Sequence, residues 1–325
     1  MADPPAPGSP GWRAVITGTG CCLPAGVLTN ADVACRVDVD DAWIVERTGI
    51  RERRAVTPGA SAPAATLALA AARRALESAA LEADALDLVL VATVTPDRLL
   101  PGVAPAVAAG LGARCGALDL SAACAGFVHG LALAQGQIQS GLARHVLLVG
   151  VEVLTPLLDL TDRETCVLFG DGAGAVVLSA FPASAGRGLQ RVVLESEGAG
   201  GDLLYADAVE RRIRMEGREV FRRAVTHLGA VITRTLEADG WSPEMVDHVV
   251  PHQANLRILD ALSRKVGIPR SRVHANLERY GNTSAASIPI VLDELHRSGR
   301  LQPGERVLFA ALGAGLVWGA ATHVW

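Results

Sequence analysis

The segments RHVLLVG (residues 144–150) and ERVLFAALG (residues 305–313) resemble each other although they lie about 160 residues apart. Each is an almost unbroken apolar run of strand length, and strands of this kind are buried on both faces by helices. The same spacing recurs upstream, where Asp87 opens one apolar strand and Asp247 opens another. The pattern indicates a duplicated α/β chain, and we expect its active site at the junction of the two halves.

The rest of the chain alternates strand-like and helix-like patterns. Strands are expected over residues 13–19, 86–95, 116–120, 145–153, 174–180, 191–197, 246–251, 306–312 and 315–324. Helices are expected over residues 63–79, 103–110, 125–140, 218–239, 255–266 and 284–297. We divide the chain into a flexible tail at residues 1–11, an N-terminal half at residues 12–185 and a C-terminal half at residues 186–325.

Composition excludes several classes of protein. The 325 residues are 50% hydrophobic and 20% charged, with a net charge of −4, which is typical of a soluble globular protein and gives no sign of nucleic-acid binding. Apolar runs stay below the ~18 residues that a membrane helix needs. The Pro-rich start has no basic segment followed by an apolar core, so we expect no signal peptide and a cytoplasmic protein.

Six cysteines are present, and none belongs to a C-x-x-C pair, so we expect neither a disulfide framework nor a metal site. Cys124 has a setting of its own, because the strand at residues 116–120 runs through SAACAGF (121–127) into a helix. A helix N-terminus favours the reactive thiolate, and the Cys124 amide can face an oxyanion. From this pattern alone, a nucleophile and a buried structural cysteine remain alternatives.

Two residues of the second half are candidate partners. His252 ends a strand and leads into QANLRI, and Asn282 lies in YGNTSAAS (280–287), just before a helix. A thiol nucleophile needs a proton acceptor or a cation, and acyl chemistry needs donors for the developing oxyanion. Taken singly, an ordinary turn asparagine and a structural histidine remain open as interpretations.

Four motifs together resemble β-ketoacyl-acyl-carrier-protein (ACP) synthase III, the initiating condensing enzyme: LSAACAGF, FGDGAGA, PHQANLRI and YGNTSAASIP, starting at residues 120, 169, 251 and 280. The resemblance runs from about Trp12 to Trp325. It implies the thiolase fold, with duplicated βαβαβαββ halves in a five-layered αβαβα arrangement, and a homodimer. It also implies a catalytic triad of Cys124, His252 and Asn282.

In the reaction that the resemblance implies, Cys124 accepts an acyl group from acyl-CoA. His252 and Asn282 then hold the malonyl-ACP thioester while it loses CO2, and the resulting carbanion attacks the acyl group to give 3-oxoacyl-ACP. No cofactor takes part. The resemblance implies an oxyanion hole formed by the backbone N–H groups of Cys124 and Ala314. FGDGAGA (169–175) is a tight glycine turn, and we expect it to serve as scaffold.

Substrate and partner contacts carry over in the same way. Trp43 and Arg47, in DAWIVERTGIRERR, and Arg163 match the segments that bind CoA. Residues 211–279 hold 13 basic and 8 acidic residues, a surface that would attract an acidic carrier protein. By resemblance, the carrier protein docks on Arg222, Arg257 and Arg264, although a solvated arginine-rich helix face remains the alternative.

The sequence departs from the family pattern around the acyl pocket. Leu100 and Leu312 stand where the housekeeping enzyme has phenylalanine, and the segment at residues 200–215 is short and charged. These changes predict a larger pocket and leave the starter acyl group open. A second function therefore stays possible, that of an acyltransferase of the same fold that passes an acyl or aryl group to a hydroxyl or amine in natural-product biosynthesis. A non-catalytic partner subunit is disfavoured because Cys124 is present.

Overall fold

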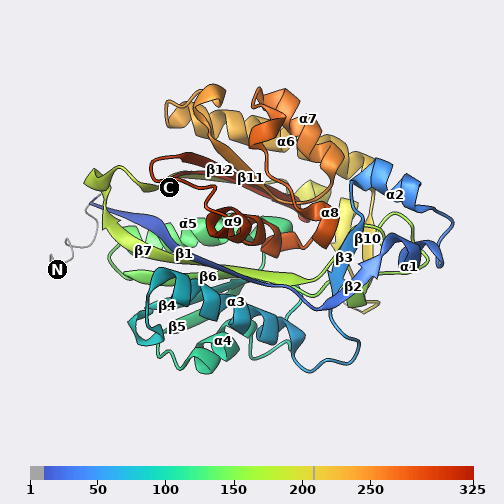
Figure 1. Ribbon diagram of the computed structural model, residues 1–325, viewed down its shortest axis with the longest axis horizontal. Helices are drawn as coiled ribbons and strands as arrows, with labels where there is room; N and C mark the ends of the chain where they lie inside the picture. Colours follow the sequence, from blue (N-terminus) through green and yellow to red (C-terminus); the bar gives the residue numbers. More distant parts are fainter. Residues whose placement is uncertain (1–10, 208) are drawn as a thin grey trace.

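The computed structural model describes residues 11–207 and 209–325 (Figure 1). Apart from Gly11, the expected N-terminal tail at residues 1–11 lies outside the described residues. Within the described residues, no helix is both long enough and apolar enough to cross a membrane.

The first half forms a five-stranded sheet in the order β1-β7-β6-β4-β5. Its strands are β1 (Trp12–Cys22), β4 (Leu88–Ala92), β5 (Gly116–Leu120), β6 (His145–Glu152) and β7 (Gly172–Pro182). β4 runs parallel to both β5 and β6, whereas β7 runs antiparallel to β6 and β1. The parallel centre explains why these segments are continuous apolar runs.

The second half repeats this order with one strand fewer. Its strands are β8 (Gly188–Ser196), β11 (His248–Pro251), β12 (Arg306–Gly313) and β13 (Val317–Val324), in the order β11-β12-β13-β8. The position that β5 holds in the first sheet is reduced here to an isolated parallel bridge between Val249 and Val273.

The duplication extends to individual hydrogen bonds. The Asp87 N–H donates to the His145 carbonyl, and the Asp87 carboxylate accepts from the His145 N–H at 2.9 Å. In the second half, the Asp247 N–H donates to the Arg306 carbonyl, and the Asp247 carboxylate accepts from the Arg306 N–H at 2.8 Å. The two aspartates begin equivalent strands, as their spacing predicts.

Helices complete five layers, αβαβα, and confirm the expected fold (Figure 1). α5 (Gly126–Gln139) and α9 (Ser287–Arg297) lie between the two sheets. α3 (Pro63–Ala79) and α4 (Val103–Leu111) cover the outer face of the first sheet, and α6 (Gly217–Ala238) and α7 (Leu256–Val266) cover that of the second. In the middle layer, Phe127 of α5 packs edge-on against Phe309 of β12, with both side chains fully buried.

Shorter elements border the second sheet and its pocket. They are β2 (Gly26–Thr29), α1 (Asn30–Ala34), α2 (Asp41–Thr48), β3 (Glu52–Ala55), β9 (Leu204–Ala206), β10 (Ile213–Met215) and α8 (Leu277–Tyr280). The strand expected over residues 86–95 ends at Ala92, because the Thr93 and Thr95 hydroxyls turn to the carboxylate of Glu152.

Candidate active site

Two short 3-10 turns meet where the halves join. One (Ala123–Ala125) precedes α5, and its counterpart (Ser284–Ala286) precedes α9. Each begins with a residue in the left-handed region, Ala123 at φ 45° and Ser284 at φ 48°. Non-glycine residues rarely adopt this conformation, and they cluster at functional sites. The turns contact each other, so the duplication builds one site from both halves.

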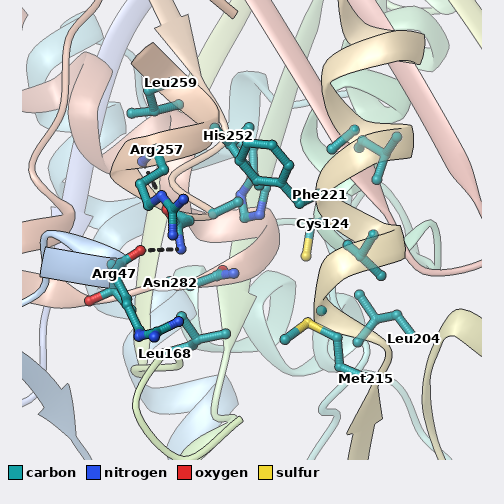
Figure 2. A pocket seen from close by; sticks show the side chains of 18 of the residues that line it. Arg47, Cys124, Leu168, Leu204, Met215, Phe221, His252, Arg257, Leu259 and Asn282 are labelled. Atoms are coloured by element: carbon teal, nitrogen blue, oxygen red, sulfur yellow. Dashed lines mark hydrogen bonds between the residues drawn. The ribbon is translucent and has the colours of Figure 1, made fainter. Parts of the chain in front are cut away.

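A cavity of about 480 Å³ opens beside these turns. Cys124, His252 and Asn282 all line it, and Figure 2 shows their side chains directed toward the same space. They come from the turn before α5, the end of β11 and the turn after α8. The structure thus brings together three residues that the motifs singled out separately.

Cys124 is 8% exposed, and burial raises the pKa of its thiol to about 12. The nearby Glu152 carboxylate raises the pKa further, while a hydrogen bond with the Ser284 side chain lowers it. The sequence-based expectation that the helix N-terminus would favour the thiolate is therefore wrong for the unliganded site. Desolvation disfavours the charged form, so the resting group is a neutral thiol.

Gly313 keeps the Cys124 amide accessible. A Cβ atom at this position would lie only 2.6 Å from the Cys124 nitrogen and 2.9 Å from the Ala123 side chain. Ala314, the other expected oxyanion donor, begins the turn that follows β12 and is half-buried. The end of β12 therefore lies directly against the turn that carries Cys124, so the two segments expected to supply the oxyanion-hole amides are adjacent.

Asn282 is held through its backbone by the FGDG segment. Its N–H donates to the Leu168 carbonyl at 2.8 Å, and its carbonyl accepts from the Gly170 N–H at 2.9 Å. Gly281, at φ 68°, leads into this position, where a Cβ would lie 2.7 Å from the Leu168 carbonyl oxygen. The side-chain Oδ1 of Asn282 accepts from the Ser284 N–H at 2.8 Å. The Asn282 amide nitrogen is thereby left as the donor available to the cavity.

His252 is anchored at the end of β11, where its N–H donates to the Ala310 carbonyl at 2.8 Å. Burial lowers the pKa of its ring to about 4, so the imidazole is neutral at pH 7. The next residue, Gln253, fastens the loop: its Nε2 donates to the Pro251 carbonyl, and its Oε1 accepts from the Asn276 N–H.

The expected CoA-binding residues gather at the same cavity. Trp43, Arg47 and Arg163 all line it, and the guanidinium carbons of Arg47 and Arg163 lie 4.6 Å and 5.9 Å from the centre of the Trp43 ring. Asn255 links this group to the second half, because its side chain donates to the Arg47 carbonyl at 3.0 Å and caps α7. An aromatic face with two guanidinium groups suits a nucleotide carrying phosphates.

The expected docking arginines are all exposed. Arg257 lines the cavity and is drawn beside Arg47 in Figure 2, while Arg264 lies in the last turn of α7. Arg222, on α6, pairs with Glu219 at 2.5 Å, which leaves less of its charge for a partner.

Comparison with known proteins identifies the family. A family model for 3-oxoacyl-acyl-carrier-protein (ACP) synthase III matches residues 118–198, and one for its C-terminal part matches residues 236–325. β-Ketoacyl-ACP synthase III of Rhodospirillum rubrum is 47% identical to this chain, with 95% of this chain and 98% of the relative covered. The synthase III of Sphingopyxis alaskensis is 47% identical over the same shares.

The chain belongs to the β-ketoacyl-ACP synthase III family. It is therefore an enzyme of the condensing, transferase type.

Solved structures of the family share its fold. The 3-oxoacyl-ACP synthase III of Aquifex aeolicus matches with a TM-score of 0.92 at 44% identity, covering 96% of this chain and all of the other. The priming β-ketosynthase of the R1128 polyketide pathway matches with a TM-score of 0.90 at 37% identity, covering 97% and 98%.

The two positions at which this synthase III departs from the expected pocket lie in different places. Leu312 is buried and lines the cavity, whereas Leu100 is 83% exposed and lies outside the cavity of its own chain. Within the short segment at residues 200–215, β9 and β10 pair antiparallel, and Leu204 and Met215 of these strands line the cavity (Figure 2). Arg214 ties this hairpin to Asp159 at 3.0 Å.

Sequence reasoning missed two residues of this synthase III site, Glu152 and Ser284. Ser284 stands inside the quoted YGNTSAAS motif but has no chemistry of its own that would single it out. Glu152 ends an apolar strand, and an acidic residue directly after the run VLLVGV was the available signal. Both are buried beside Cys124.

Proposed function

We propose that this chain primes fatty acid or polyketide synthesis by two reactions in one cavity. Cys124 takes an acyl group from acyl-CoA, and the acyl-enzyme then condenses with malonyl-ACP to give 3-oxoacyl-ACP, CO2 and CoA. The supporting observation is that a buried thiol, a neutral histidine and an asparagine with a free amide line one cavity with a Trp–Arg group. In this proposal both thioesters are substrates and no cofactor takes part.

In the first reaction the Cys124 sulfur attacks the thioester carbonyl, and negative charge develops on its oxygen. The amides of Cys124 and Ala314 stabilise this charge in the proposal, and the bare Gly313 leaves room for it. Each donor of this type typically contributes about 10²–10³ in rate. The thiol must lose its proton during the attack, because burial keeps it neutral at rest.

In the second reaction the charge develops on the malonyl thioester oxygen as CO2 leaves. Asn282 cannot ionise, and its Oδ1 is already occupied by the Ser284 N–H, so its amide nitrogen donates to the enolate oxygen. His252 is neutral and donates from one ring nitrogen without adding a charge to a buried site. Two neutral donors stabilise an enolate that exists only in the condensation, which favours this reaction over simple acyl transfer.

We propose that CoA and ACP approach from the same side. Trp43, Arg47 and Arg163 receive the nucleotide of acyl-CoA at the mouth of the cavity. Arg257, Arg264 and Arg222 on α7 and α6 attract the acidic carrier protein whose acyl arm must enter the same mouth. The two substrates then bind in turn.

We also propose a cytoplasmic homodimer. Leu99 and Leu100 are 99% and 83% exposed, which is unusual for two adjacent large apolar side chains. In a dimer, Leu100 would contribute to the acyl pocket of the second subunit. Because Leu100 and Leu312 replace larger rings, the pocket would accept a starter larger than acetyl.

The proposed condensation is tested by measuring CO2 release. Wild-type protein is acylated from a panel of acyl-CoAs, and labelled CO2 is then measured after addition of malonyl-ACP. Asn282→Ala should leave acylation nearly intact and lower CO2 release by about 10²-fold or more, the scale of one lost oxyanion donor. A wild-type protein that is acylated yet releases no CO2 would overturn the condensation and favour the acyltransferase, whose acceptor is a hydroxyl or amine.

A further inference from the structure

Glu152 is an ionisable group inside the active site to which the proposed reaction assigns no role. It ends β6, its side chain is fully buried, and it lies close enough to Cys124 to affect the pKa of the thiol. A buried carboxylate is costly unless it is satisfied by donors, so its presence beside a nucleophile needs a physical reason.

The groups around Glu152 are hydrogen-bond donors. Its Oε2 accepts from the Thr95 hydroxyl at 2.7 Å and from the Val94 N–H at 3.2 Å, and its Oε1 accepts from the Ser284 hydroxyl at 3.2 Å. The Thr93 hydroxyl adds a weaker contact at 3.5 Å. An ionised carboxylate is an acceptor only, so this shell is built for the charged form.

Ser284 connects Glu152 to the three proposed catalytic residues. Its hydroxyl donates to Glu152 at 3.2 Å, its N–H donates to the Oδ1 of Asn282 at 2.8 Å, and the turn that it begins packs against the turn that carries Cys124. The Ser284 side chain lowers the pKa of the Cys124 thiol, and the Ser284 main chain raises that of the His252 ring. The left-handed backbone of Ser284, at φ 48°, places the residue at this meeting point. Because the Ser284 hydroxyl donates its own proton to Glu152, its lone pairs remain free to accept the Cys124 proton.

We propose that Ser284 and Glu152 form the proton relay that deprotonates Cys124, an inference that rests on the proposed function only for the identity of the acyl donor. As the sulfur–carbon bond forms, the thiol proton passes to the Ser284 oxygen, and the Ser284 hydroxyl proton passes to Glu152. When the carbon–sulfur bond to CoA breaks, the proton returns along the same path to the CoA sulfur, which leaves as a thiol.

Charge conservation favours this route over His252. Moving the proton from Cys124 to ionised Glu152 leaves one negative charge in the buried site before and after the transfer. Moving it to His252 would create an additional thiolate–imidazolium pair, and burying such a pair costs several kcal/mol per ion before attraction offsets it. The relay also leaves His252 neutral, as its donor role in the condensation requires.

The acidities of the two groups agree with the geometry. Burial raises the pKa of Glu152 to about 7, whereas burial lowers that of His252 to about 4, so Glu152 is the stronger base. Glu152 is faced by Thr93, Val94 and Thr95 from the end of β4, by Ser284 before α9 and by Cys124 before α5. Among these, Cys124 is the titratable group.

The test uses iodoacetamide, which alkylates the thiol without any acyl donor. Alkylation of Cys124 is followed by peptide mass spectrometry from pH 5 to pH 9, because five other cysteines are present. In wild type the rate should rise with an inflection near the Glu152 pKa of about 7. In Glu152→Gln that inflection should vanish and the rate at pH 7.5 should fall by about 10²-fold, the scale of general-base catalysis.

The sign of the change separates the relay from a simple charge effect. If Glu152 acted only through its charge, its removal would make Cys124 easier to ionise and would speed alkylation. Faster alkylation of Glu152→Gln, or an unchanged pH profile, would overturn the relay. Glu152→Asp, which keeps an ionisable group, should retain a pH inflection at a reduced rate.

Two serine variants complete the design. Ser284→Ala removes the link and should lose the inflection as Glu152→Gln does, and it carries the test if the glutamine variant does not fold. Ser287→Ala is the matched control, because Ser287 is a buried serine of the same segment that contacts Thr283 at 3.2 Å. Wild type that alkylates as expected but gains no acyl group from acyl-CoA would refute the proposed function and leave the relay standing.

Discussion

Single atoms at three residues define the chemistry of this site. The Oδ1 of Asn282 is occupied by a backbone N–H, which leaves the amide nitrogen as the donor. Burial keeps His252 and Cys124 neutral, one by lowering its pKa and the other by raising it. These three side chains carry no charge at rest, so none of them repels an anionic malonyl substrate.

The nucleophile is tested by replacing its sulfur. We expect Cys124→Ala to abolish the covalent acyl adduct formed with acyl-CoA, measured by intact protein mass, because no other thiol lines the cavity within the described residues. Cys166→Ala is the control. Cys166 is fully buried in a hydrophobic core cluster, so its replacement should not affect the adduct. An adduct that persists in Cys124→Ala would refute the assignment.

At the scale of elements, one strand of each half ends against the 3-10 turn of the other half. β12 ends at Gly313, against the turn that carries Cys124, and β6 ends at Glu152, against the turn that begins with Ser284. The first contact needs the smallest residue so that an oxyanion fits, and the second supplies a carboxylate. One repeated geometry thus serves two chemical purposes.

Gly313→Ala tests the first of these contacts. Its methyl group would fall 2.6 Å from the Cys124 nitrogen, so the turn must shift and the oxyanion position is disturbed. We expect acylation by acyl-CoA to slow by about 10²-fold or more, measured by quenched-flow mass spectrometry.

Gly136→Ala is the matched control, because Gly136 lies in α5 with nothing within 4 Å of the added methyl group. It should leave acylation unchanged and stabilise the protein by about 0.5–1 kcal/mol through helix propensity. Equal slowing in both variants would mean that Gly313 has no special part in catalysis.

At the scale of the whole molecule, the arrangement of the two halves decides where the basic surface lies and how stability depends on pH. The proposed docking arginines lie on α6 and α7, which cover the outer face of the second sheet, while α3 lies in the opposite outer layer (Figure 1). Of the basic residues in the segment 211–279, Arg218 and Arg257 line the cavity itself.

Reversing the charge of Arg257 tests whether the carrier protein docks on this side of the molecule. Arg257→Glu should raise the KM for malonyl-ACP by about tenfold or more and raise that for acyl-CoA less, because the carrier protein brings a larger negative surface. Added salt should have the same effect on the wild type, since it screens exposed charges. Arg73→Glu, on α3, is the control for net charge, and an equal loss in that variant would contradict a localised docking surface.

His323 links the two halves and should make their stability depend on pH. Its Nε2 accepts from the Ile16 N–H at 3.3 Å, and burial lowers the pKa of the ring from 6.5 to about 3. A depressed histidine pKa contributes stability that is present above pH 6.5 and is lost as the pH falls toward 3, because the unfolded chain binds the proton first.

Compared with His323→Gln, the wild type should lose about 2 kcal/mol more of its unfolding free energy between pH 7.5 and pH 5. Urea unfolding at both pH values measures the difference. Parallel losses in the two proteins would show that His323 is protonated in the folded state.

The sequence by itself determined the duplicated α/β fold and the family, and it singled out Cys124, His252 and Asn282, which the structure places around one cavity. Those features are local: apolar runs, turn residues and short motifs carry them at each position. The bounds of α3 followed for the same reason, since it begins and ends at the predicted residues, Pro63 and Ala79. The helix expected over residues 284–297 begins later, at Ser287, and the short helices α1, α2 and α8 were not expected. The motif FGDG also revealed a scaffold turn, which the structure shows holding the backbone of Asn282.

Tertiary structure alone decided the ionisation of the site and the partners of its groups. The sequence places Cys124 at a helix start, which predicts a thiolate, but burial in the folded chain raises the pKa of the thiol. Glu152 and Ser284 lie 132 residues apart and meet only because the two halves fold against each other. Desolvation and long-range contact depend on the whole packed molecule, and no local pattern encodes them.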